Sequence, residues 1–149
     1  MSSETLVERA IRVLDLGQWH CENGNTDRFR DEVESFVRDD GGMALLLLDA
    51  ELRTQKQCYE EVLSAFLASV CMLPPELLWE LRVLILTSYL THESANARLE
   101  AADGLEWMGC RHAARYIRRA AEAETYPTIG ETLLRIADNL SNIDAGGPT

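Results

Sequence analysis

The chain has 149 residues and a formal net charge of −11, from 25 acidic and 14 basic side chains. Forty-six per cent of the residues are hydrophobic and 26% are charged, which is the balance of a globular protein and excludes a disordered chain. The apolar runs are too short to cross a bilayer, and the chain does not open on a signal peptide, so we expect a cytoplasmic protein.

The distribution of charge predicts the kind of partner. The acidic excess lies in residues 1–110, whereas residues 111–149 hold as many bases as acids. Nucleic acid would be repelled by most of this surface, whereas a basic protein would be attracted to it. We therefore expect a basic protein partner, and neither a nucleic acid nor a membrane.

Helical periodicity runs from end to end and no segment alternates with a period of two, which predicts an all-α fold. The first helix is expected to begin after Ser2 or Ser3 and to end at Gly17. Thr26 is the predicted cap of a second helix, which ends at the glycine pair 41–42.

The middle of the chain predicts three further helices. A short apolar helix is expected over residues 43–53 and a longer one over residues 57–72. Pro74 breaks the chain, and Pro75 suits the first turn of a helix that ends near residue 90.

The last third predicts three more helices, for a total of seven to eight. Ser94 is expected to cap a helix that ends at Gly109, residues 111–123 form the next, and Pro127 starts a last helix that ends near residue 143. Because the loops are short, successive helices should lie antiparallel in a single domain, residues 1–149.

One short segment recurs 35 residues further along the chain. The matching positions are Leu99, Ala102, Asp103 and Leu105 in the first copy and Leu134, Ala137, Asp138 and Leu140 in the second. Self-similarity at this period is typical of stacked helical hairpins.

The run from Leu90 to Leu105, followed by Met108 and Gly109 and by residues 113–117, resembles the HEAT-repeat family. It carries an Asn shortly before Arg98, a pair of alanines on the inner face of the first helix, and a glycine that closes this helix.

The resemblance implies an α–α superhelix of stacked helical hairpins. Residues 1–42 would be capping helices, residues 43–143 the stacked hairpins and residues 144–149 a flexible tail. Arg98 would pair along the stack, and the second helix of each hairpin would line a concave side.

Three surface groups are candidate partner-binding sites. They are a basic ridge on the helix over 111–123, a Trp flanked by acids, and the acidic outer face of the second helix. Their members are Arg111, Arg115, Arg118 and Arg119; Glu76, Trp79 and Glu80; and Asp27, Asp31 and Glu34. For the two charged groups we favour an ordinary solvated face, with Arg118 paired to Glu122, whereas Trp79 can equally be a core residue.

No catalytic motif is present, so we expect no enzyme activity. The adjacent pairs Asp39–Asp40 and Glu60–Glu61 should diverge around a helix and be solvated. His20–Cys21 and Cys110–His112 lack metal-ligand spacing, so neither a metal site nor a cofactor is predicted. The four cysteines, including Cys58 and Cys71, are expected to be reduced core thiols.

These features together predict a non-catalytic protein-binding module. The sharpest hypothesis is an immunity-type inhibitor, a monomer or homodimer, that neutralises a basic toxin such as a nuclease with its acidic surface. One alternative is an adaptor that binds a peptide or helix in its concave groove, with apolar contacts around Trp79. Another is a repeat-type lyase or chaperone, which would need a reactive Cys110 or Cys21.

Overall fold

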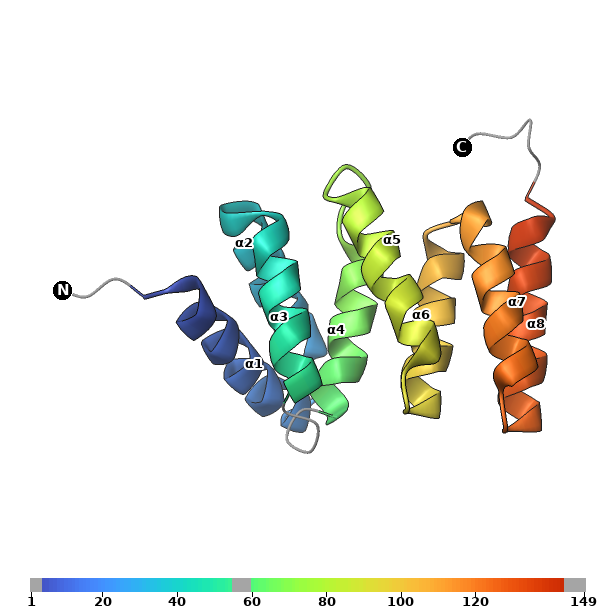
Figure 1. Cartoon of the computed structure of the whole chain (residues 1–149). Helices are drawn as coiled ribbons and strands as arrows, with labels where there is room; N and C mark the ends of the chain where they lie inside the picture. The colour runs from blue at the N-terminus through green and yellow to red at the C-terminus, as the bar shows by residue number, and fades with distance from the viewer. Residues whose placement is uncertain (1–3, 55–59, 144–149) are drawn as a thin grey trace. The chain divides into compact units, whose positions relative to one another are not determined.

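The computed structural model describes residues 4–54 and 60–143 and contains no strand in these ranges. The all-α prediction with about eight helices is confirmed (Figure 1). The helices are α1 (Leu6–Glu22), α2 (Thr26–Asp40), α3 (Gly42–Thr54), α4 (Glu60–Met72), α5 (Trp79–Ser88), α6 (Ala95–Trp107), α7 (Ala114–Ala123) and α8 (Pro127–Ser141), with short 3₁₀ helices η1 (Tyr89–Thr91) and η2 (Arg111–Ala113).

Several predictions concern residues outside those the structure describes. These are the caps at Ser2 and Ser3, the start of a helix at residue 57, the environment of Cys58 and the tail over residues 144–149.

The chain divides into two compact units. The first holds residues 1–69 and 73–78, and the second holds residues 70–72 and 79–149. Most of α4 belongs to the first unit, while its last turn belongs to the second.

In the first unit, helices α1, α2 and α3 all pack on one another. Their inward positions recur with helical spacing, so each helix contributes one apolar face to a shared core. The largest buried side chains of this unit are Leu14, Phe29, Phe36, Leu45, Leu48, Phe66 and Leu67, all fully inaccessible to solvent.

Helix α1 runs through Gly17 to Glu22, so the prediction that it ends at Gly17 is wrong. Gly17 is buried in the helix, and a Cβ atom there would lie 2.4 Å from Cδ1 of Phe29 on α2. The glycine is present because the helices approach closely, rather than because the chain turns. The helix ends instead near Gly24, whose φ is 71°.

We expect Gly17→Ala to lower the free energy of unfolding by about 1–3 kcal/mol, because the fully buried Phe29 ring must move. Gly130→Ala in α8 is the matched control. There the new Cβ would meet its nearest neighbour at 3.6 Å, an ordinary contact. The control should gain about 0.5–1 kcal/mol from helix propensity, as measured by urea denaturation. Equal effects of the two changes would contradict the close approach.

The caps of the first helices are polar side chains and glycines at the helix boundaries. Thr5 caps α1 and accepts a hydrogen bond from Glu8 N at 3.1 Å, while the Glu8 carboxylate accepts one from Thr5 N at 3.3 Å. Asn25, rather than Thr26, is the cap residue of α2, since Thr26 already lies in the helix. Gly41 ends α2 with a φ of 65°, and Gly42 begins α3.

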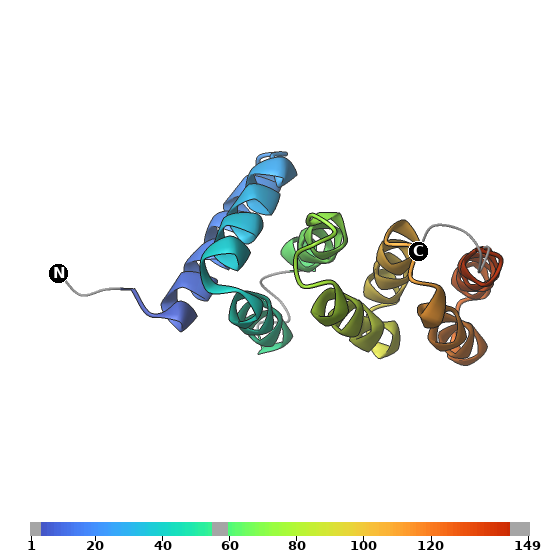
Figure 2. The same cartoon turned by 90° about the horizontal axis from the view of Figure 1, so that it is seen from above.

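The second unit has two layers of helices (Figure 2). Helices α6 and α8 lie side by side in one layer, and α5 and α7 lie in the other. The predicted cap at Ser94, the left-handed turn at Gly109 (φ 67°) and the start of α8 at Pro127 are confirmed.

The sequence repeat corresponds to equivalent positions in adjacent helices. Ala102 and Leu105 on α6 are fully buried, as are Ala137 and Leu140 on α8. The two matching aspartates are exposed. The repeated pattern therefore marks the inward faces of two neighbouring helices of the second unit.

Helix α5 begins at Trp79, four residues later than the prediction that places Pro75 in its first turn. Residues 74–78 form a turn in which Leu78 has a φ of 52°. Within the helix, the apolar Leu84 is 66% exposed, whereas the charged Arg82 is only 1% exposed.

Arg82 is buried because it caps the end of α4. Its Nε donates to the Val70 carbonyl oxygen at 2.6 Å, and its Nη2 donates to the Cys71 carbonyl oxygen at 3.0 Å. The last carbonyls of a helix have no partner within the helix and carry its negative dipole end, so a cation satisfies both needs.

Candidate functional site

The two units differ strongly in charge. Among its described residues the first unit carries 15 acidic and 6 basic side chains, a net charge of −9. The second unit carries 9 acidic and 7 basic side chains, a net charge of −2. The acidic character of the chain is therefore concentrated in the first unit.

The acidic face predicted on the second helix is present on α2. Asp27 and Asp31 are exposed and Glu34 is partly exposed. Arg30 pairs with Asp27 and Arg38 with Glu34, each at 3.0 Å, and such surface pairs contribute little free energy. Asp31 has no ion-pair partner within residues 4–54 and 60–143. The face therefore keeps a net negative field despite its arginines.

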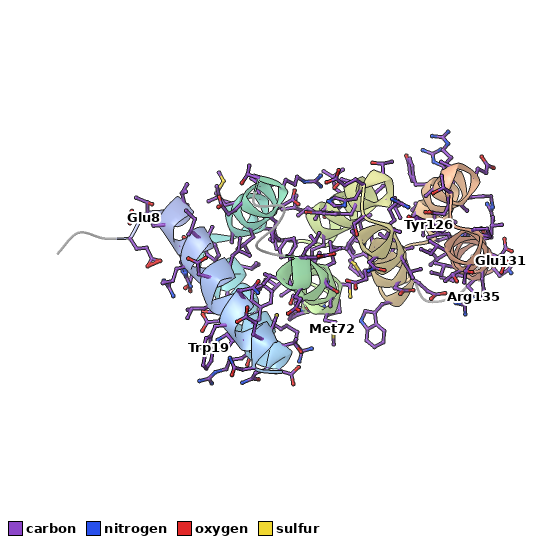
Figure 3. All side chains as sticks on the ribbon, turned by 90° about the horizontal axis from the view of Figure 1, so that it is seen from below. Glu8, Trp19, Met72, Tyr126, Glu131 and Arg135 are labelled. Atoms are coloured by element: carbon purple, nitrogen blue, oxygen red, sulfur yellow. The ribbon has the colours of Figure 1, made fainter. Side chains whose placement is uncertain are left out.

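Helix α1 carries an exposed stripe that the sequence reasoning missed. Glu8, Asp15, Trp19 and Glu22 are all exposed, and their positions fall within about 60° of one another around the helix. Trp19 is 58% exposed and projects from the last turns of α1 (Figure 3). The stripe combines a large aromatic anchor with three carboxylates.

Trp19 escaped prediction because the sequence from Gln18 to Asn25 was expected to be a loop. Its place on the stripe follows only when α1 continues through Gly17. A helical wheel drawn across the glycine would have shown Trp19 between Asp15 and Glu22.

The predicted group of Glu76, Trp79 and Glu80 does not form one exposed helix face. Glu76 is exposed in the loop before α5, while Trp79 begins the helix and is half-buried. The Arg82 guanidinium lies 5.8 Å from the Trp79 ring centroid. Of the three, Glu80 alone is an exposed residue of the helix, because α5 begins at Trp79 and leaves Glu76 outside it.

The predicted basic ridge is present on η2 and α7. Arg111, Arg115 and Arg119 are exposed, and Arg118 is partly exposed. The expected pair of Arg118 with Glu122 is wrong. Arg118 instead pairs with Asp138 on α8 at 3.1 Å and donates to Ser141 Oγ at 3.2 Å, because α8 packs directly along α7. Arg118 therefore joins α7 to α8, and its charge is partly neutralised by Asp138.

Arg98 pairs within one hairpin, so the prediction that it pairs along a stack is wrong. Its Nε and Nη2 donate to the two carboxylate oxygens of Glu124 at 2.8 and 2.7 Å. Its Nη1 donates to the backbone carbonyls of His92 and Glu93. The arginine thus joins the start of α6 to the residue that follows α7.

The two adjacent carboxylate pairs that were predicted to diverge around a helix, Asp39–Asp40 and Glu60–Glu61, differ in their contacts. Asp39 and Asp40 converge on one cation, with Arg9 Nη1 at 2.9 Å from the first and 3.1 Å from the second. The prediction that the pair diverges is wrong, because Arg9 on α1 reaches both carboxylates, but Asp39 is solvated as predicted, with 59% of its side chain exposed. Glu60 and Glu61 are exposed in the first turn of α4, as predicted.

Cys21, Cys71 and Cys110 are free thiols. Cys110 is buried, but Cys21 and Cys71 are only partly buried. Of these three cysteines, the prediction of a core thiol therefore holds for Cys110 alone. Burial raises the pKa of Cys21, and the nearby carboxylates of Glu61 and Glu22 raise it further. A raised pKa keeps this thiol protonated and weakly nucleophilic, unlike a catalytic cysteine.

His20 and Cys21 lie in the last turns of α1, while Cys110 precedes η2 and His112 lies within it. In the part of the chain that the structure describes, no three His, Cys, Asp or Glu side chains are grouped as metal ligands. Within the same ranges, no helix has the length and apolar content that spanning a membrane requires.

No family model, curated protein or solved structure matches this chain. The resemblance to HEAT repeats therefore stays a prediction, and the function must be argued from the two units themselves.

Proposed function

We propose that the chain is a non-catalytic protein-binding module, and that it acts as an immunity-type inhibitor of a basic toxin such as a nuclease. In this proposal the helices belong to a HEAT-like solenoid. The acidic first unit contacts the partner and covers its active site. The observation that carries the proposal is the net charge of −9 on this unit together with an exposed Trp amid its carboxylates.

The charge supports fast capture of a basic partner. Complementary charges steer two proteins together and raise the association rate, an effect that salt weakens. Acids outnumber bases on both helices described above, by three to two on α1 and by six to three on α2.

Trp19 supports specificity in this contact. Tryptophan is enriched among the interface residues whose truncation costs most affinity, and a ring surrounded by polar groups can be buried by the partner. Glu8, Asp15 and Glu22 on the same stripe would then meet cations at the rim of the interface.

The proposal is tested by capture from a lysate of the organism that makes the chain. The bait is the full chain, used as wild type, as Trp19→Ala and as the triple variant Asp27→Asn, Asp31→Asn, Glu34→Gln. The matched control is Glu122→Gln, Glu131→Gln, which removes two exposed acids from the second unit. Figure 3 labels Glu131.

We expect a basic protein to be retained by the wild type and the control, and to bind each first-unit variant about tenfold or more weakly. The captured protein should be toxic when expressed alone and harmless when expressed with the wild-type chain. An acidic partner, or a partner whose binding the first-unit variants leave unchanged, would refute the proposal.

A further inference from the structure

A groove of about 580 Å³ lies on the second unit, between the end of α5 with η1 on one side and α7 on the other. Its apolar lining, here called the floor, includes the buried Leu90 and Ala120 and the exposed Ala123. Helices α5 and α7 run in the same direction in both views (Figures 1 and 2). The volume is within the range of ligand-binding sites in proteins.

The acid and the base at the inner end of this groove neutralise each other. Glu124 lines the groove, but both of its carboxylate oxygens accept hydrogen bonds from Arg98. Burial of the pair leaves neither charge available to attract a ligand. The charge at the groove is therefore set by its remaining ionisable groups.

Arg119 is the uncompensated cation of the groove. It is exposed and lines the groove beside Tyr116. Within the described ranges neither Arg119 nor Arg115 has an acidic partner, and Glu122, the acid closest along α7, pairs with neither. In a chain of net charge −11, two cations without acidic partners on one helix face are conspicuous.

Tyr116 holds the two arginines in place. The Arg115 guanidinium lies 4.8 Å from the Tyr116 ring centroid and donates to its hydroxyl at 2.7 Å. The Arg119 guanidinium lies 6.0 Å from the same centroid. Cation–π contacts of this kind position both charges before a ligand arrives, which lowers the entropic cost of binding.

His92 lines the opposite wall of the groove. Its Nδ1 accepts a hydrogen bond from Ser94 N at 3.0 Å. The ring stacks on Tyr89 with centroids 5.3 Å apart, which fixes its orientation. The groove thus combines an apolar floor with a fixed imidazole on one wall and a net positive edge on the other.

We propose that this groove binds an acidic segment of another protein, with an apolar side chain on the alanine floor and carboxylates on Arg119 and Arg115. Arg111 on η2 continues the row, and Arg115 and Arg119 lie about 6 Å apart along α7. Carboxylates four residues apart on a helix, or two apart on an extended segment, have a similar spacing. The row extends beyond the groove, so a segment suits it better than a small molecule.

This site is independent of the acidic surface, because it lies on the other unit and has the opposite charge. A second copy of the chain is a poor occupant, since two molecules of net charge −11 repel each other.

Selection from a random peptide library on the full chain tests the proposal, with the double variant Arg115→Gln, Arg119→Gln as the counter-selection target. We expect the retained peptides to carry two or more acids and one apolar residue. A labelled retained peptide should bind Arg119→Gln about tenfold more weakly than the wild type. Arg135→Gln, which removes an exposed arginine from α8, and Asp31→Asn in the first unit should leave its affinity unchanged.

Neutral or basic peptides, or equal affinity for Arg119→Gln and wild type, would overturn the proposal. So would sedimentation that shows self-association of the wild type and its loss in the double variant, because the face would then belong to a second copy. If the peptide selection gives one of these results, the capture experiment on the first unit is unaffected. The proposal for the groove can therefore be refuted without refuting the proposed inhibitor function.

Discussion

We expect Arg82→Ala to lower the free energy of unfolding by about 4 kcal/mol, the largest effect of any single change to an arginine of this chain. The substitution removes both donors from the carbonyls of Val70 and Cys71 and leaves a cavity where a side chain is 1% exposed. Two buried acceptors at the end of α4 would be left without their cation. Urea denaturation followed by circular dichroism measures the loss.

Two variants separate the causes of this loss. Arg82→Met keeps most of the volume but supplies no donor, so it should still lose about 3 kcal/mol. Arg135→Ala removes an exposed arginine and should change stability by no more than about 0.5 kcal/mol. If Arg82→Met were as stable as the wild type, the capping role of the guanidinium would be excluded.

Glu124→Ala is expected to cost about 3 kcal/mol, because it leaves the largely buried Arg98 guanidinium without its carboxylate. The side chain of Glu124 is fully inaccessible to solvent and that of Arg98 is 15% exposed. A double-mutant cycle uses Arg98→Met and Glu124→Leu, alone and combined. The double variant should lose less stability than the sum of the losses of these two single variants, since no unpaired charge remains in it. Additive losses in this double-mutant cycle would show that the pair does not interact.

The same pair predicts a dependence of stability on pH. The hydrogen bonds from Arg98 hold the pKa of Glu124 below its ordinary value of 4.5. A carboxyl group with a lowered pKa in the folded state stabilises the fold at pH values above its ordinary pKa. This contribution is lost as the pH falls below 4.5 and through the folded-state value.

We therefore expect the difference in stability between the wild type and Glu124→Gln to be largest near neutral pH and to shrink as the solution is acidified. Denaturation curves of both proteins across the acid range measure it. A difference that stays constant, or that grows on acidification, would contradict the assignment.

Much of the fold follows from sequence because helical periodicity and caps are local. The starts at Ser94 and Pro127 and the turn at Gly109 depend on side chains within one turn of the boundary. The misplaced boundaries have non-local causes. Gly17 looks like a helix end, but its missing side chain is required by Phe29, which is distant in sequence.

Arg82 shows the same limit for side chains. In an apolar run it would be assigned to the solvent face, because a buried arginine is rare unless it is paired. Its partners are backbone carbonyls of an earlier helix, and every residue has a carbonyl, so no sequence pattern indicates them.

For the candidate sites, the positions of the charged residues could be predicted from the sequence, but their ion-pair partners could not. Asp27, Asp31 and Glu34 on α2, and Arg111, Arg115 and Arg119 along α7, lie where helical spacing predicts. The partners of Arg118 and Arg98 depend on which helices pack together, so they emerge only from the structure. The groove beside Arg119 likewise needs two helices and a loop in place.

The most direct test of the central claim is the association rate of the captured partner at increasing salt, measured on the full chain by stopped-flow fluorescence. If the acidic first unit recruits a basic protein, the rate should fall by about tenfold or more between roughly 50 mM and 500 mM NaCl, and the triple variant of α2 should begin lower and fall less. An association rate that is unchanged by salt, or equal in the wild type and the triple variant, would contradict it.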